Sequence, residues 1–115
     1  MAYDEHLAER LRANLKENRI SFEEKKMFGG ICYMVDEKMC LGVINDDLMI
    51  RIDPKDQDNF LREKGCRPMD FAKRPMKGFL YVSPEGVDMD SDLDKWVTRC
   101  LEFNPIAKSS KKNKI

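Results

Sequence analysis

Apolar residues at helical spacing predict one helix near each end of the chain. The first runs from Tyr3 to about Asn18, with apolar positions Tyr3, Leu7, Ala8, Leu11 and Leu15 separated by charged residues. The second begins at Ser91, which forms a capping-box spacing with Asp94, and ends at Asn104-Pro105. Its apolar stripe is Leu93, Trp96, Val97, Cys100 and Leu101. Each helix therefore has one face suited to a hydrophobic core.

Short apolar runs between these helices predict an antiparallel meander. Ile20 and Phe22 begin a half-exposed strand, and apolar runs follow at 31–35, 39–44 and 48–52. About three polar residues separate these last runs. A parallel crossover needs roughly a dozen residues or more, so the connections are predicted to be hairpins. Gly29-Gly30 is typical of a sharp bend or a close backbone approach.

A short helix and one further strand complete the prediction. Asp53-Pro54 resembles a helix start and Lys64-Gly65 a helix end, while residues 66–77 are predicted to be irregular and 78–82 to form a strand. The order α-β-β-β-β-α-β-α predicts an α+β fold with two layers, in which helices cover one face of a sheet of four to five antiparallel strands. We expect one domain over residues 1–104 and a basic, disordered tail over 105–115.

Charge argues against direct binding of duplex DNA by the domain. The 115 residues contain 21 basic and 21 acidic side chains. Four lysines and no acid lie in residues 105–115, which leaves 17 basic against 21 acidic side chains elsewhere. A duplex-binding surface usually shows a positive excess. The tail is expected to be a solubilising segment, with contact to nucleic acid or an acidic partner as the alternative.

The sequence has no pattern typical of an enzyme, a metal site or a membrane span. The four cysteines form no C-x-x-C pair, and His6 is the only histidine, so zinc is not expected and the cysteines are expected in the core. No Ser–His–Asp set or cofactor fingerprint is visible. The aspartates at 88, 90, 92 and 94 lack the glycine and glutamate of a calcium loop, and suit a helix N-terminus. With no secretory signal and no apolar run near ~18 residues, we expect a non-catalytic cytoplasmic protein without cofactor or metal.

Four basic residues are the candidate binding site. Arg67, Arg74 and Lys77, with Arg51 nearby, have side chains suited to a carboxylate or phosphate. The alternative is that they form ion pairs with the acids of the domain. The eight methionines also allow two interpretations, because Met fills irregular cores and also serves adaptable binding surfaces. An exposed patch of Met and Cys on the sheet would favour a protein partner or a homodimer.

Several short motifs, taken in order, resemble a known family. They are Met27-Phe28-Gly29-Gly30, Leu48-Met49-Ile50-Arg51 before Asp53-Pro54, Arg67-Pro68-Met69, Met76-Lys77-Gly78-Phe79-Leu80-Tyr81-Val82 and Leu93-Asp94-Lys95-Trp96-Val97. Over about residues 3–104 the chain resembles the N-terminal domain of the TfoX/Sxy family. Full-length members are bacterial regulators of competence genes, thought to act as co-activators beside a DNA-binding transcription factor, and they carry a second, helical domain that has no counterpart in this sequence. The resemblance implies a stand-alone regulatory domain that binds a protein, possible partners including a transcription factor, and it supplies no catalytic residues. A module that binds a small ligand or anion is the alternative.

Overall fold

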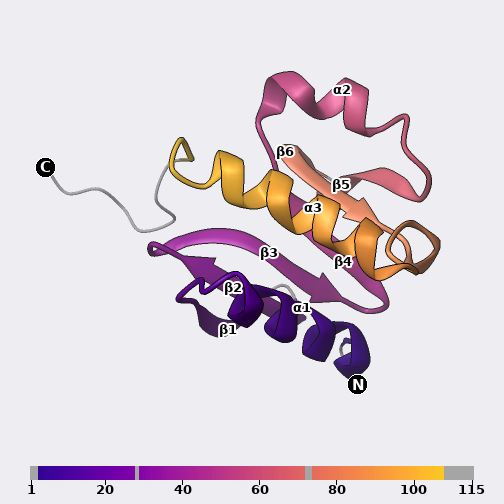
Figure 1. Ribbon diagram of the computed structural model, residues 1–115. Coiled ribbons are helices and arrows are strands. Elements are labelled where there is room, and N and C mark those ends of the chain that lie inside the picture. The colour runs from indigo at the N-terminus through magenta and orange to yellow at the C-terminus, as the bar shows by residue number, and fades with distance from the viewer. Residues whose placement is uncertain (1–2, 28, 72–73, 108–115) are drawn as a thin grey trace, which may run out of the picture.

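The computed structural model describes residues 3–27, 29–71 and 74–107 as helices and a six-stranded antiparallel sheet (Figure 1). The elements are α1 (Glu5–Glu17), β1 (Glu23–Met27), β2 (Gly30–Val35), β3 (Lys38–Ile44), β4 (Asp47–Arg51), η1 (Pro54–Asp56), α2 (Gln57–Phe60), β5 (Cys66–Phe71), β6 (Arg74–Val82), η2 (Pro84–Gly86) and α3 (Asp90–Phe103). The strands lie in the order β1-β2-β3-β4-β6-β5. The predicted α+β fold and its meander are confirmed, and the sheet has one more strand than predicted.

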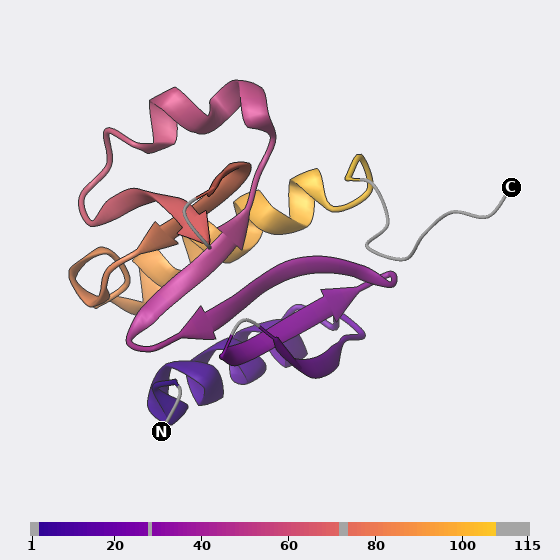
Figure 2. The same ribbon diagram turned by 180° about the vertical axis from the view of Figure 1, so that it is seen from behind.

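Helices α1 and α3 lie side by side on one face of the sheet (Figures 1 and 2). Their apolar stripes pack against alternate residues of β2, β3, β4 and β6. The buried side chains of this core include Leu7, Leu11, Leu15, Tyr33, Leu41, Val43, Leu48, Ile50, Leu80, Val82, Trp96 and Val97. The Tyr33 hydroxyl, which is also buried, donates a hydrogen bond to the Ala8 carbonyl of α1 at 3.1 Å. The two helices therefore close this face of the sheet.

The opposite face of the sheet carries a second, smaller cluster of buried side chains. Its members are Cys32, Met34, Met39, Ile44, Met49 and Met69, with half-buried Phe79 and Tyr81 packed against them. None of the described helices covers this face, which we call the helix-free face (Figure 2). Each of the four methionines is at most 6% exposed. The core-filling interpretation is therefore confirmed for them, and they form no exposed patch.

The start of α3 differs from the predicted capping box. The helix begins at Asp90, its N-cap residue is Met89, and no side chain caps it, so Ser91 lies within the first turn. Arg10 of α1 lies against this end, where Nη2 donates to the Asp88 carbonyl at 3.4 Å and to Asp90 Oδ1 at 3.2 Å. The acids do lie at the helix N-terminus as expected. Arg10 joins α1 to these acids, but as a hydrogen-bond donor it does not cap the free N–H groups of the first turn.

The prediction of an irregular segment at 66–77 is wrong, because β5 and the first part of β6 occupy it. Pro68 and several basic residues disrupt the alternation by which a strand is recognised. Proline is tolerated because β5 is an edge strand of the sheet. The register passes from Pro68↔Leu80 to Asp70↔Pro75, so β6 carries extra residues, among them Gly78 at φ +86°.

A smaller bulge in β3 turns a cysteine toward the helices. Tyr33 pairs with Leu41 and Met34 pairs with Met39, which leaves Cys40 as the extra residue. Cys40 belongs to the helix-covered core. Burial, together with the neighbouring Cys40 thiol, raises the pKa of Cys100 on α3. The expectation that cysteines lie in the core is confirmed for Cys32, Cys40 and Cys100, while Cys66 is half-buried.

The segment between β4 and β5 is held on α3 by a stacked arginine. The Arg99 guanidinium lies 4.3 Å from the ring centroid of Phe60 and 4.7 Å from that of Trp96. Arg99 Nη1 and Lys95 Nζ each lie 2.8 Å from a carboxylate oxygen of Glu63. Two cations from α3 therefore meet one acid of the segment, and these two ion pairs lower the pKa of Glu63. The rings of Phe60 and Trp96 meet edge to face at 89°, so the guanidinium packs against two perpendicular rings and is backed by the ion pairs. We call this arrangement the Arg99 stack.

The end of α3 is tied to the β2–β3 hairpin. The side chain of Asn104, which is buried, donates to the Val35 carbonyl at 3.2 Å, and Lys38 Nζ donates to the Asn104 carbonyl at 3.0 Å. Residues 105–107 continue as a turn, in which Ala107 is buried and Ile106 is 71% exposed. The rest of the predicted tail, 108–115, lies outside the described residues.

The β1–β2 turn generates a matched pair of glycine substitutions. At Gly30 an added Cβ would overlap the Val43 carbonyl oxygen, which belongs to the neighbouring strand. At Gly29 the space is open and only the positive φ of +78° opposes a side chain. We expect Gly30→Ala to lower the free energy of unfolding by about 3 kcal/mol and Gly29→Ala by about 1 kcal/mol. Urea titration of both variants tests this, and equal losses would contradict the close approach at Gly30.

The Arg99 stack generates a second prediction. Arg99→Ala removes both aromatic contacts and one ion pair, so we expect a loss of about 2 kcal/mol in unfolding free energy. Arg99→Lys keeps the charge without the planar group, and should lie between Arg99→Ala and the wild type. Arg62 is exposed, so Arg62→Ala is the control and should change stability by less than about 0.5 kcal/mol. A loss in Arg99→Ala no larger than in this control would show that the stack does not hold the segment.

Candidate functional site

The structure divides the four predicted basic residues between three strands. Arg51 ends β4, Arg67 lies on β5, and Arg74 and Lys77 lie on β6. Arg67 is the cross-strand partner of Tyr81 and Arg51 that of Phe79, which places both arginines on the helix-free face. The side chains of Arg74 and Lys77 lie outside the described part of the structure. The predicted site is thus a strand surface rather than a loop.

Arg67 is held in place by neighbours at one end of this face. Its Nη2 lies 2.7 Å from Asp47 Oδ2, and its Nη1 lies 3.5 Å from Asp47 Oδ1 and 3.3 Å from the Ser83 hydroxyl. The guanidinium carbon lies 5.1 Å from the ring centroid of Tyr81. The hydrogen bonds to Asp47 raise the pKa of Arg67 above its ordinary value. Arg67 therefore forms an ion pair with an acid of the domain, which was the alternative interpretation from the sequence.

Arg51 has a different environment at the other end of β4. Its Nη1 donates to the Met39 carbonyl at 3.4 Å, next to the β3 bulge, and its guanidinium carbon lies 5.5 Å from the ring centroid of Phe79. Among the described residues it forms no ion pair. Burial lowers the pKa of Arg51, because its charged form loses contact with water. Arg51 is therefore a half-buried cation with a neutral hydrogen-bond acceptor.

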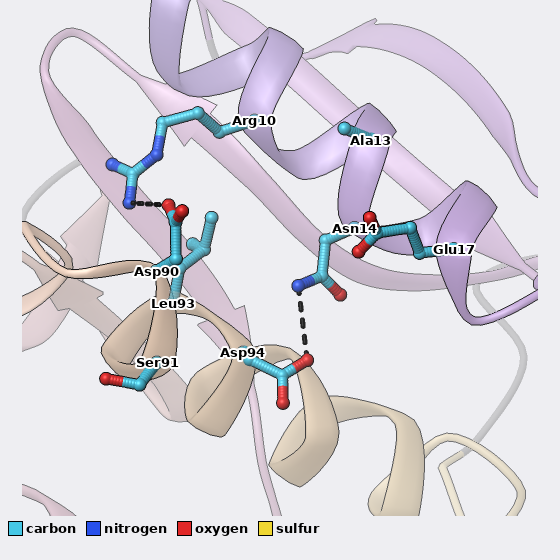
Figure 3. A pocket seen from close by; sticks show the side chains of 8 residues that line it. All are labelled: Arg10, Ala13, Asn14, Glu17, Asp90, Ser91, Leu93 and Asp94. Atoms are coloured by element: carbon cyan, nitrogen blue, oxygen red, sulfur yellow. Dashed lines mark hydrogen bonds and ion pairs between the residues drawn. The ribbon is translucent and has the colours of Figure 1, made fainter.

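Sequence reasoning did not identify the groove between α1 and α3, which has a volume of about 420 Å³ (Figure 3). Its lining is acidic, with Glu17, Asp90 and Asp94 against one arginine. Figure 3 shows that two contacts cross it: Arg10 reaches Asp90, and Asn14 Nδ2 donates to Asp94 Oδ1 at 3.2 Å. These contacts join the two helices, so the polar groups of the groove already have a structural role. The sequence did contain an indication of this groove. The aspartates at 88–94 lie at the start of α3, and α1, which packs beside α3, adds Glu17 to the lining.

The described residues contain no group of three or more His, Cys, Asp or Glu side chains placed to hold a metal ion. His6 is exposed at the start of α1, where its backbone N–H donates to Asp4. Burial raises the pKa of the Cys32 and Cys66 thiols to about 11. These thiols are therefore protonated near neutral pH, which makes them poor nucleophiles and poor metal ligands.

The geometry above is accompanied by one match to a known family. The family model described as the TfoX N-terminal domain matches residues 16–104. Neither the curated proteins nor the solved structures include a match to this chain. Among the described helices, none is both long and apolar enough to cross a bilayer.

The buried thiols predict how stability depends on pH. A folded-state pKa near 11 for Cys32 exceeds the ordinary thiol value of 9.0. The folded state therefore holds this proton more tightly than the unfolded state does. Its stabilising effect is complete below pH 9 and is lost as the pH rises from 9 to 11. We expect the free energy of unfolding to fall over this range, and to fall less steeply in Cys32→Ala.

Urea titrations at pH 8, 9, 10 and 11 measure this difference. Other groups titrate in the same range, so the comparison between wild type and Cys32→Ala isolates the contribution of the one thiol. Equal pH dependence in the two proteins would contradict the burial effect at Cys32.

Proposed function

Because this chain belongs to the TfoX N-terminal domain family, we propose that it is a non-catalytic regulatory domain that acts by binding a protein in the bacterial cytoplasm. The partner proposed is a component of transcription, a transcription factor or a polymerase subunit, as the resemblance to competence regulators implies. The domain match covers residues 16–104, which contain every strand of the sheet and α3. The match therefore contains the whole sheet and α3, but only the last two residues of α1.

The observation that carries the proposal is the Arg67–Tyr81 pair on the helix-free face. The Arg67 side chain is 46% exposed, while Asp47 and Ser83 fix its position. Arginine and tyrosine are enriched among the residues that dominate binding energy in protein interfaces. A side chain that is fixed before binding loses less conformational entropy on binding. This end of the face therefore offers a preorganised contact.

An affinity pull-down from native cytosol tests the proposal. The wild-type chain should recover a transcription factor or polymerase subunit, and Arg67→Ala should recover at least fivefold less of it. Arg62→Ala removes an exposed arginine that lies outside this face and should recover as much as the wild type. Circular dichroism of both variants verifies that they fold. Recovery of no transcription component, or equal recovery by Arg67→Ala and Arg62→Ala, would argue against the proposal.

A second copy of the chain is the alternative partner, and the edges of the sheet count against it. Because the four methionines of the helix-free face are buried, a homodimer would have to form through the edges of the sheet. Edge β1 carries four charged residues in five, and edge β5 contains Pro68 and an irregular register. Both features oppose the addition of a strand. Recovery of only the chain itself in the pull-down would favour the homodimer over the regulatory partner.

A further inference from the structure

A cavity of about 350 Å³ lies at the Arg51 end of β4, away from Arg67 and Asp47. Three segments that are distant in sequence form it: the last residue of β4 with residues 52–54, Gly78 and Phe79 of β6, and the end of α3 with its following turn. Apolar side chains dominate the lining, which comprises Ile52, Pro54, Phe79, Phe103, Ile106 and Ala107 besides Arg51, Asp53 and Gly78. Its volume falls within the range of about 300–1,000 Å³ common for small-molecule sites.

Backbone hydrogen bonds fix the floor of this cavity. The Gly78 carbonyl accepts from Ile52 N–H at 2.8 Å, and Gly78 N–H donates to Gln57 Oε1 at 2.7 Å. The positive φ of Gly78 permits this approach, and an added Cβ would lie 3.2 Å from both the Ile52 oxygen and Pro54 Cγ. The β6 bulge and the η1–α2 segment are therefore joined to one another. The cavity is a built feature of the fold and not a gap between loose segments.

The two charged side chains of the lining differ in whether they have a partner of opposite charge. Asp53 accepts a hydrogen bond from Lys55 N–H at 3.1 Å, because it caps η1, and its Oδ2 lies 3.9 Å from Lys55 Nζ. Arg51 has one long hydrogen bond to a carbonyl and the ring of Phe79, and it forms no ion pair with any residue that the structure describes. A partly desolvated guanidinium gains from a carboxylate that meets it in the plane of its N–H donors. Arg51 is therefore the charged group of the cavity that lacks an ion-pair partner among the described residues.

We propose that this cavity binds a small monocarboxylate whose carboxyl group meets Arg51 and whose apolar body packs on Phe79, Phe103 and Ile106. The apolar lining favours a hydrocarbon chain or ring over a sugar or a nucleotide. A single negative charge fits better than a phosphate dianion, because the Asp53 carboxylate lies in the same lining. Ile106, which is 71% exposed without ligand, would be covered by the apolar body. The site is separate from the proposed protein contact at Arg67 and does not depend on it.

Titration with 3-phenylpropanoate, followed by backbone amide NMR of the full chain, tests the proposal. The neutral 3-phenylpropanamide has the same apolar body without the charge, and acetate has the charge without the body. We expect saturable shifts at Gly78, Phe79 and Ile106 with 3-phenylpropanoate, and at least tenfold weaker binding of both other compounds. This comparison uses only the wild-type protein, so it does not depend on the folding of a variant.

Variants then assign the contact. Arg51→Gln should weaken the binding of 3-phenylpropanoate at least tenfold and leave the binding of the amide unchanged. Arg67→Gln is the matched control, since it alters the other arginine that lies over an aromatic ring of the same face, and it should bind as the wild type does. The proposal is overturned if the acid and the amide bind equally well, if Arg67→Gln loses as much affinity as Arg51→Gln, or if the acid causes no saturable shift at these residues.

Discussion

The packing of α1 and α3 on a single face of the sheet is the constraint on which the rest of this molecule depends. Both helices cover the same face, so the alternate residues of each central strand meet a large, dry core. The side chains that point the other way have no described helix against them, and five of the six buried residues in their cluster are methionine or cysteine. Flexible, unbranched methionine can fill the irregular space that a curved and bulged sheet leaves. The binding surfaces that we propose consequently involve the ends of this face, at Arg67 and Arg51.

Three arginines illustrate how the same side chain acquires different roles from its neighbours. Arg99 has both a carboxylate and two aromatic rings, and it fastens a loop segment to a helix. Arg67 has a carboxylate and one ring, and remains half exposed. Arg51 has one ring and a backbone carbonyl. Arg99 and Arg67 each pair with one carboxylate, whereas Arg51 pairs with none among the described residues. Of the three, Arg51 is therefore the arginine that remains available to an anion.

Periodicity predicted most of the fold, because burial repeats along regular elements. The helical stripe from Leu93 and the alternation at Leu48, Ile50 and Ile52 each follow from one face of an element meeting a core. Strand β5 escaped prediction because Pro68 and the irregular register break the alternation, and only its edge position makes that tolerable. The start of α3 was misplaced because Ser91 and Asp94 lie within the helix, and Asp94 accepts a hydrogen bond from Asn14 of α1, which is distant in sequence.

The candidate site was only partly predictable for the same reason. The sequence identified Arg51 and Arg67 by residue type, but the difference between them lies in tertiary partners. Asp47, which holds Arg67, lies on another strand, and the apolar lining beside Arg51 comes from the middle of β6 and the end of α3. No local pattern relates these residues.

Strand β4 separates the two binding surfaces that we propose. Asp47 and Arg51 are at its two ends, about 13 Å apart at roughly 3.3 Å per residue. This exceeds the screening length of about 8 Å at physiological salt, so a charge bound at one end exerts little electrostatic effect at the other end when both are near solvent. Coupling between the sites would then require a shift of β4 itself, which is paired on both sides and buried at its three central residues. The protein contact and the carboxylate site are therefore expected to respond independently to substitutions, and each arginine can act as the control for the other.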